Sequence, residues 1–259
     1  MKKLLLVLFV LVLSACGISS PDTVTGSGKM ISESFDVRDF DQIRVGTSGV
    51  LYLKQGDDFS LRVEADDNIL PVLDISVEKG VLILRTTPEV SRLKYETLIY
   101  YVTLPSLSAL EISGSADVRA EDFSADALNI NINGSGNVTF TDLDAQTLSA
   151  RLSGSGDLIL PVVSAVNILA EVNDSGQMEI GGRTDSLTVR TSGSGDLLAE
   201  KLQATSAEVA VNGSGNATLW AVERLDVSIS GSGDVQYLGT PQLSEKISGG
   251  GELIALGSR

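Results

Sequence analysis

The stretch Ser153-Gly-Ser-Gly-Asp157 is one of eight short cassettes that recur between Ser113 and Glu252. Each cassette combines small residues with an acid or an amide at its last position. The full set is Ser113–Asp117, Asn133–Asn137, Ser153–Asp157, Asn173–Gln177, Ser192–Asp196, Asn212–Asn216, Ser230–Asp234 and Ser248–Glu252. Successive cassettes lie 18 to 20 residues apart. A sustained repeat of this length is typical of a solenoid, in which each coil buries its apolar side against its neighbours.

The residues between the cassettes favour β-strands. Apolar residues alternate directly before a cassette, as in Leu128-Asn-Ile-Asn-Ile132, and directly after it, as in Val138-Thr-Phe140. Strands that recur at this period with no helix between them pair in parallel only if the chain coils. We therefore predict an all-β fold, a right-handed parallel β-helix with coils of about 20 residues over residues 111–259.

Residues 30–110 are rich in strand patterns but less regular. Alternation predicts strands within residues 42–46, 50–54, 60–64, 74–78, 81–85 and 98–104. Glu78-Lys-Gly80 is typical of a hairpin turn, and Asp66–Leu73 is the only stretch that favours a helical turn. The pattern leaves open whether this portion continues the β-helix or forms a separate lobe.

The cassettes predict columns of stacked polar side chains. If Ile132 points inward, strict alternation turns Asn133, Ser135 and Asn137 outward and the two glycines between them inward. A tight turn with positive φ at the glycines would break this alternation. The outward residues proposed to contact a ligand are Asp117, Asn137, Asp157, Gln177, Asp196, Asn216 and Asp234, with Ser135, Ser155, Ser194, Ser214 and Ser232.

In the last column acids alternate with amides from coil to coil. This arrangement separates carboxylates that would otherwise stack about 4.8 Å apart and repel one another. Interleaved amides are also able to hydrogen-bond to the acids. Two interpretations remain open: the repeat is a duplicated unit tuned for stability, or its polar face is read by a ligand.

The N-terminus is typical of an export signal. Lys2 and Lys3 precede an apolar run from Leu4 to Leu13, which is too short for the roughly 20 residues that span a bilayer. The ending Leu13-Ser-Ala-Cys16 resembles the bacterial lipobox, which implies cleavage after residue 15 and lipid attachment to Cys16. We expect residues 16–29, which are small and polar, to form a flexible tether between the lipid and the body.

Composition excludes several kinds of chemistry. The chain has no histidine, and Cys16 is its only cysteine, which excludes Ser-His-Asp and Cys-His catalysis and the usual zinc sites. Its 34 acidic and 19 basic residues give a net charge of −15, or −17 once Lys2 and Lys3 are removed with the signal. Such a surface repels nucleic acid, so we predict no nucleic-acid partner and no cofactor.

These features together resemble a known family. The lipobox, the opening Phe40–Gly56, the segment Val102-Thr-Leu-Pro-Ser-Leu107 and the cassettes are similar to the putative auto-transporter adhesin, head GIN domain family over about residues 38–240. The resemblance implies a β-helical bacterial protein that is secreted or lipid-anchored. It supplies no catalytic residues.

The sequence disfavours two chemical alternatives to binding, a calcium site and a glycosidase site. Calcium needs 6–8 oxygen ligands around one point, whereas a column offers one carboxylate every second coil, and the acidic loops Asp57-Asp58 and Asp66-Asp67-Asn68 are typical of a solvated surface. A glycosidase needs two acids at a defined separation in a cleft, whereas here acids are spread over short coils. We therefore predict no metal site and no catalytic residue.

The sequence favours a non-enzymatic, lipid-anchored protein of the cell envelope that acts in adhesion or surface interaction. We expect the protein to be attached to the membrane through its N-terminal lipid. Its ligand would be a polysaccharide or a cell-surface protein. Gly17 after the lipidated cysteine predicts the outer membrane if the envelope is Gram-negative. An enzyme acting on extracellular polysaccharide is one alternative, and a structural component that forms homo-oligomers through open strand edges is another.

Overall fold

The computed structural model describes residues 22–258, and the predicted signal and Cys16 lie outside them. The described chain is all β, with one short 3-10 turn, and contains no helix long and apolar enough to span a membrane. The strands are β1 (Asp22–Thr25), β2 (Met30–Phe35), β3 (Gln42–Val45), β4 (Val50–Gln55), β5 (Ser60–Asp66), β6 (Leu73–Glu78), β7 (Val81–Thr86), β8 (Val90–Lys94), β9 (Leu98–Leu104), β10 (Ala109–Ile112), β11 (Asp117–Ile132), β12 (Val138–Leu152), β13 (Leu158–Val172), β14 (Met178–Thr191), β15 (Leu197–Val211), β16 (Ala217–Ile229), β17 (Val235–Leu238), β18 (Gln242–Ile247) and β19 (Leu253–Gly257).

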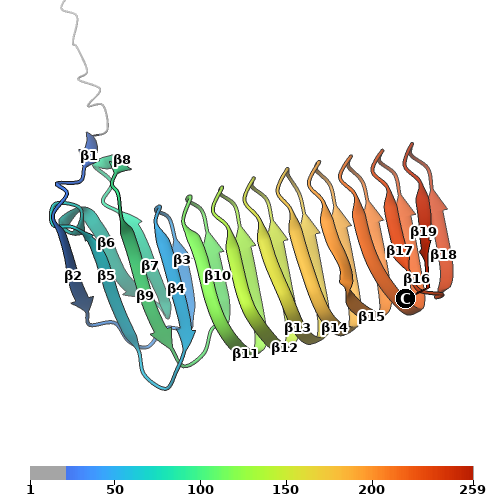
Figure 1. Cartoon of the computed structure of the whole chain (residues 1–259), viewed down its shortest axis with the longest axis horizontal. Coiled ribbons are helices and arrows are strands. Elements are labelled where there is room, and N and C mark those ends of the chain that lie inside the picture. Colours follow the sequence, from blue (N-terminus) through green and yellow to red (C-terminus); the bar gives the residue numbers. More distant parts are fainter. Residues whose placement is uncertain (1–21, 259) are drawn as a thin grey trace, which may run out of the picture.

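The long strands β11 to β16 stack as successive coils of a solenoid (Figure 1). Each pairs in parallel with the next, and the pairing joins equivalent positions of successive repeats, such as Leu128 with Leu148 and Leu148 with Ile168. The predicted parallel β-helix is therefore confirmed. The structure differs in one respect, because the two strands expected in each repeat form one continuous bent strand.

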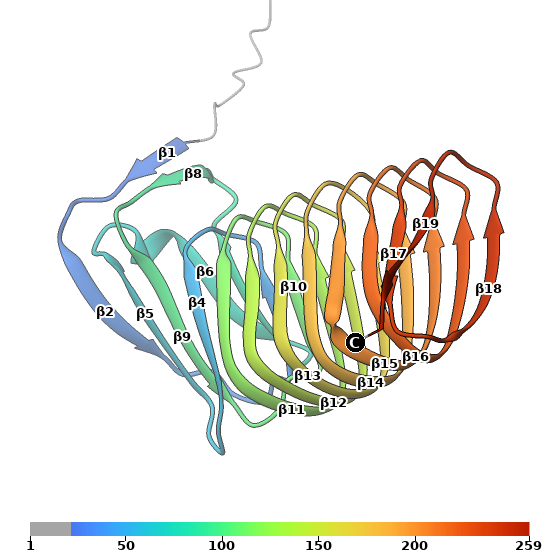
Figure 2. The same cartoon turned by 45° about the vertical axis from the view of Figure 1, so that its right-hand side comes forward.

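Corners of a coil are marked by two consecutive exposed residues most clearly in β12. In β12 these are Thr141-Asp142 and Gln146-Thr147, and residues between the corners alternate between buried and exposed. Each doublet shifts the alternation by one position, so that the chain turns while its apolar side chains keep facing inward. With the cassette as the third corner, a coil has three faces, which Figure 2 shows as a closed loop around the core.

Residues 30–110 continue the solenoid, but not in chain order. β3 and β4 pair in parallel with β10 and β11, and β7 and β9 pair in turn with β3 and β4. Antiparallel strands close this end, because β5 lies between β2 and β9 while β6 pairs with β7. The β6–β7 turn is the predicted hairpin, with positive φ at Lys79 and Gly80. A 3-10 turn at Leu70–Val72 lies within the predicted helical stretch.

The described part of the expected tether is held against the body. β1 pairs in parallel with β8. Gly28 N donates to Asp66 Oδ1 at 2.8 Å, and Ser27 Oγ donates to Asp67 Oδ1 at 2.6 Å. The bonds from Ser27 and Lys29 lower the pKa of Asp67. In the structure, β8 and the acidic loop at Asp66–Asn68 thus contact the chain between Asp22 and Lys29, whereas the sequence alone predicted a flexible segment over residues 16–29.

Candidate functional site

The cassettes form one long edge of the solenoid, which we call the cassette ridge (residues 113–117 and their repeats to 248–252). In Figure 1 it is the row of narrow turns along the top of the coils. The structure adds one coil that the sequence pattern missed, at Gly46-Thr-Ser-Gly49. Ser115 N donates to Thr47 O at 3.1 Å, and Asp117 N donates to Gly49 O at 2.9 Å. The sequence signal for this coil is Gly49 followed by an alternating strand. The signal is weak because Thr47 stands where the later cassettes have their first glycine, and Val50 stands where they have an acid or an amide.

Glycine is required on the ridge because neighbouring coils touch through their backbones. A Cβ on Gly134 would lie 1.9 Å from Gly114 O, and one on Gly136 would lie 2.0 Å from Ala116 O. Neither glycine has a positive φ. Ser135 and Asn137 are exposed, as the alternation predicted. The predicted inward direction of the glycines is wrong, because a Cβ at Gly134 or Gly136 would point at the backbone of the neighbouring coil and not into the core.

The last column forms a ladder of hydrogen bonds between coils. Asp117 Oδ1 accepts from Asn137 N and from Asn137 Nδ2, both at 3.0 Å. Asn137 Oδ1 in turn accepts from Asp157 N at 2.9 Å. The same pattern runs through Asp196, Asn216, Asp234 and the N–H of Glu252. These side chains thus satisfy backbone donors that strand pairing leaves open.

The ladder is interrupted at one coil. Asp157 Oδ1 accepts from Gln177 N at 3.0 Å, but among the described residues the Gln177 side chain makes no bond to the next coil. This cassette also carries Asp174 where the other seven have glycine as their second residue. Its backbone is shifted so that Gly176 N donates to Gly154 O at 3.2 Å. The ladder therefore has two segments of side-chain acceptors, from Asp117 to Asp157 and from Asp196 to Asp234.

The first column is also partly used within the molecule. Ser192 Oγ donates to Asn173 Oδ1 at 3.0 Å, Ser230 Oγ donates to Asn212 Oδ1 at 2.7 Å, and Asn173 Nδ2 donates to Ser153 Oγ at 3.3 Å. Serine and asparagine in this column therefore complement one another as donor and acceptor across coils.

The middle serines differ from both outer columns. Their hydroxyls are exposed and make no hydrogen bond to another side chain or carbonyl in residues 22–258; they are Ser135, Ser155, Ser194, Ser214 and Ser232. Their backbone N–H groups hold the coils together, as when Ser135 N donates to Gly114 O at 3.1 Å. Of the predicted contact residues within 22–258, this row and the Gln177 amide keep their side-chain hydrogen-bonding groups available.

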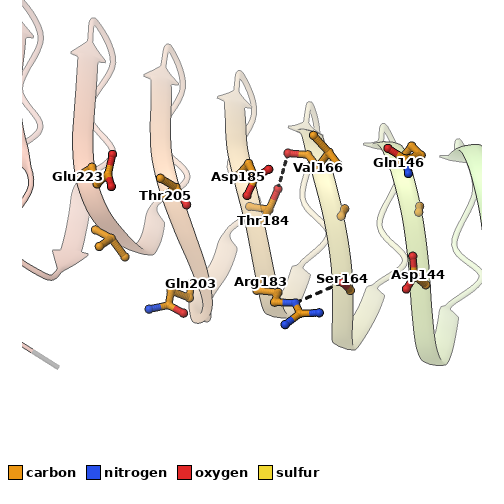
Figure 3. A pocket seen from close by; sticks show the side chains of 13 residues that line it. Asp144, Gln146, Ser164, Val166, Arg183, Thr184, Asp185, Gln203, Thr205 and Glu223 are labelled. Atoms are coloured by element: carbon orange, nitrogen blue, oxygen red, sulfur yellow. Dashed lines mark hydrogen bonds between the residues drawn. The ribbon is translucent and has the colours of Figure 1, made fainter.

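A groove that the sequence analysis missed runs across the face opposite the ridge, over β12 to β16 (Figure 3). Its volume is about 490 Å³. Its floor is built from small residues that pair across coils, Ala145, Ala165 and Thr184. The recurrence of alanine at the coil period, from Ala125 onward, was the signal that could have found it.

Polar side chains form the two walls of this groove. Asp144, Ser164, Arg183 and Gln203 lie along one wall, and Gln146, Asp185, Thr205 and Glu223 lie along the other. Arg183 Nε donates to Ser164 Oγ at 3.3 Å. Thr184 Oγ1 lies 3.1 Å from both Val166 O and Ser186 O, so its buried hydroxyl is satisfied. The groove thus offers carboxylates, amides and hydroxyls to a ligand that lies along the solenoid axis.

The acids do not gather into a metal centre. Within the described chain, no group of three or more Asp, Glu, Cys or His residues is placed to hold a metal ion. On the ridge, amides separate the acids of the ladder from Asp117 to Asp234, and only Asp234 is followed by a second acid, Glu252.

Solved structures share this fold. A putative lipid binding protein from Parabacteroides distasonis is 26% identical with a TM-score of 0.86, and the match covers 91% of this chain and 100% of that one. A putative adhesin from the same organism is 25% identical with a TM-score of 0.85 and the same coverage. A putative adhesin from Parabacteroides merdae is 20% identical with a TM-score of 0.82, covering 91% and 99%, and shows the fold alone.

No curated protein matches this sequence. A family model does match, over residues 39–241, which is most of the solenoid and its N-terminal coils. The span agrees with the sequence motifs at Phe40, at Val102–Leu107 and in the cassettes. The chain therefore belongs to the family described as putative auto-transporter adhesin, head GIN domain.

Proposed function

We propose that this protein is a non-enzymatic adhesin of the cell envelope that binds an extended polysaccharide or a cell-surface protein along its solenoid. The observation that carries the proposal is repetition. The same free hydroxyl recurs on neighbouring coils about 4.8 Å apart, in two runs separated by Ser175, whose hydroxyl donates to Asp174 Oδ1. A ligand with its own repeating polar groups would meet several coils at once, so weak contacts would add up.

We also propose that the protein is extracytoplasmic and anchored through a lipid on Cys16. The family supports a surface location, and the lipobox supports the anchor. Mass spectrometry of the N-terminal peptide would show a diacylglyceryl mass on Cys16, and Cys16→Ser should move the protein from the membrane to the soluble fraction. An unmodified N-terminal peptide would reject the anchor.

The aspartates of the ladder support binding over catalysis. Asp117, Asp157, Asp196 and Asp234 each accept a backbone N–H from the next coil. A carboxylate engaged in this way stabilises the fold and is not free to act as a general acid. Substituting these aspartates would therefore test stability rather than ligand contact.

The test of function is retention of residues 17–259 on a panel of insoluble polysaccharides and whole cells, with the supernatant assayed for released sugars. The contact variant replaces Ser135, Ser155, Ser194, Ser214 and Ser232 with alanine. A matched control replaces Ser149 and Ser228, which lie on strands away from the ridge. We expect retention without release, reduced in the contact variant and unchanged in the control.

Each other outcome has a definite meaning. Release of new sugar ends would overturn the proposal in favour of an enzyme acting on polysaccharide. Retention that is equal in the contact variant and the wild type would remove the ridge as the contact face and direct the same test to the groove residues Asp144, Asp185 and Gln203. Absence of retention would favour a structural role in the envelope.

A further inference from the structure

The last coil of the solenoid has an open edge. β18 pairs with β16, β19 pairs with β17, and no further described strand pairs with β18. Leu243 and Ile247 are 40% and 43% exposed, whereas Leu225 and Ile229, their neighbours in the previous coil, are fully buried. The apolar core therefore ends at β18 with its cross-section uncovered, which is the feature that promotes edge-to-edge association.

One residue in β18 breaks the core pattern. Glu245 pairs in register with the buried Val227 and so points toward the core side of the strand. The same column holds an apolar residue in every earlier long strand: Ile130, Ala150, Ala170, Val189, Val209 and Val227. An inward-pointing charge on an edge strand is a known means of preventing further strand addition.

A second copy of this chain is the matching partner for the open edge. The N-terminal end is closed by antiparallel strands β2, β5 and β6, so it does not present the parallel core columns that β18 would extend. The C-terminal coil of another copy does present them. Two such coils would meet as an isologous pair, with the two β18 strands antiparallel.

Glu245 obstructs every favourable register of that pair. If Leu243 lies opposite Ile247 of the second copy, Glu245 lies opposite its own counterpart, and two like charges face each other between the cores. A shift of two residues places Glu245 opposite Leu243 or Ile247, where its carboxylate is buried without a partner. A shift of one residue turns the apolar side chains of the two copies to opposite faces.

The other edge strand carries a second obstacle. Pairing of β19 with β17 is regular at Leu253 but shifts between Tyr237 and Leu238, so that Leu238 pairs with Gly257. Gly257 has a φ of 103°. A bulge of this kind bends an edge strand and hinders pairing.

We infer that Glu245 prevents β18 from pairing with β18 of a second copy, so that removing its charge converts this edge into a dimer interface. The experiment compares the wild type with Glu245→Val, both from Gly17 onward, by sedimentation velocity over a range of concentrations. Wild type should remain a monomer, and Glu245→Val should shift with concentration to a species of twice the mass. Glu208→Val is the matched control, because Glu208 is an exposed acid on a strand inside the solenoid.

Two further measurements keep the result interpretable. Leu243→Lys in the Glu245→Val background returns a charge to the core side of β18 and should restore the monomer. Hydrogen exchange should show new protection of the β18 amides in the dimer. A Glu245→Val protein that is folded by circular dichroism yet monomeric throughout would overturn the inference, as would a wild type that already dimerises with β18 protected.

Discussion

At the scale of single residues, the glycines of the ridge set the tightest constraint on the chain. A methyl group on Gly136 would meet the carbonyl oxygen of Ala116, which belongs to the backbone and cannot rotate away. We expect Gly136→Ala to lower the free energy of unfolding by about 2–3 kcal/mol, as overpacking does. Urea denaturation measures this. Gly250→Ala is the control, since its nearest neighbour is Ser232 Oγ at 3.8 Å, and it should be close to neutral. Equal midpoints for both variants would contradict this account.

Strict alternation predicted the exposure of Ser135 and Asn137, because Ile132 and Val138 fix which side of the chain faces the core. It did not foresee that a Cβ at the glycines would point at the next coil, because the chain bends within the cassette and does not continue as a strand. The role of the aspartates was predictable only in part. Sequence reasoning expected acid–amide bonds between coils, and one such bond joins Asn137 to Asp117. It did not foresee that the carboxylates also accept backbone N–H groups, because which donors strand pairing leaves open depends on how the chain turns at the corner.

At the scale of elements, a row of stacked side chains joins the N-terminal strands to the solenoid. The Tyr52 and Tyr101 rings stack with centroids 5.4 Å apart, and Arg62 lies 4.0 Å from the centre of the Tyr101 ring. Arg119 covers the other side of Tyr52 at 5.8 Å. The row crosses β5, β9, β4 and β11. It therefore links strands that are far apart in sequence.

We expect Tyr52→Ala and Tyr101→Ala to be coupled by about 0.5–1.5 kcal/mol in a double-mutant cycle, because stacked rings stabilise one another beyond their buried area. Urea denaturation of the four proteins gives this coupling energy. A second cycle that pairs Tyr52 with Tyr237, which lies in β17 near the other end, should give none. Additive effects in the Tyr52–Tyr101 cycle would show that the row does not act as a unit.

Alternation predicted β3, β4, β5, β6, β7 and β9 almost residue for residue, but it missed β2, β8 and β10, and it did not give the order of the strands in the sheet. Alternation reports which side of a strand is buried, and it carries no information about which strand lies beside it. The pairing of β3 with β10 brings Arg44 within 2.8 Å of Glu111, which is 67 residues later. Contacts of this range are fixed by the packing of the whole core, whereas the coils after Ser113 follow chain order and so could be read from their period.

At the scale of the whole molecule, the two ends of the solenoid are closed to different degrees. We therefore expect the local stability to be lower at the more open, C-terminal end. Each coil is stabilised mainly by its neighbours, so a terminal coil with one neighbour opens most easily. At the N-terminal end β2 and β5 cover the core, and the bonds from Ser27 and Gly28 to Asp67 and Asp66 hold the chain in place. At the C-terminal end every residue of β18 is exposed.

Native-state hydrogen exchange should therefore show a gradient of opening free energies along the axis. Amides of β18 and β19 should exchange first, and those of β12 to β14 should exchange last. Amides of β4 and β9 should have opening free energies close to those of β12 to β14, because antiparallel strands close the N-terminal end. The Glu245→Val protein provides the internal check: at concentrations where it dimerises, protection should rise at β18 and stay unchanged at β13. Uniform protection from β4 to β19 in the monomer would mean that the solenoid unfolds as one cooperative unit, and that its open end carries no cost in local stability.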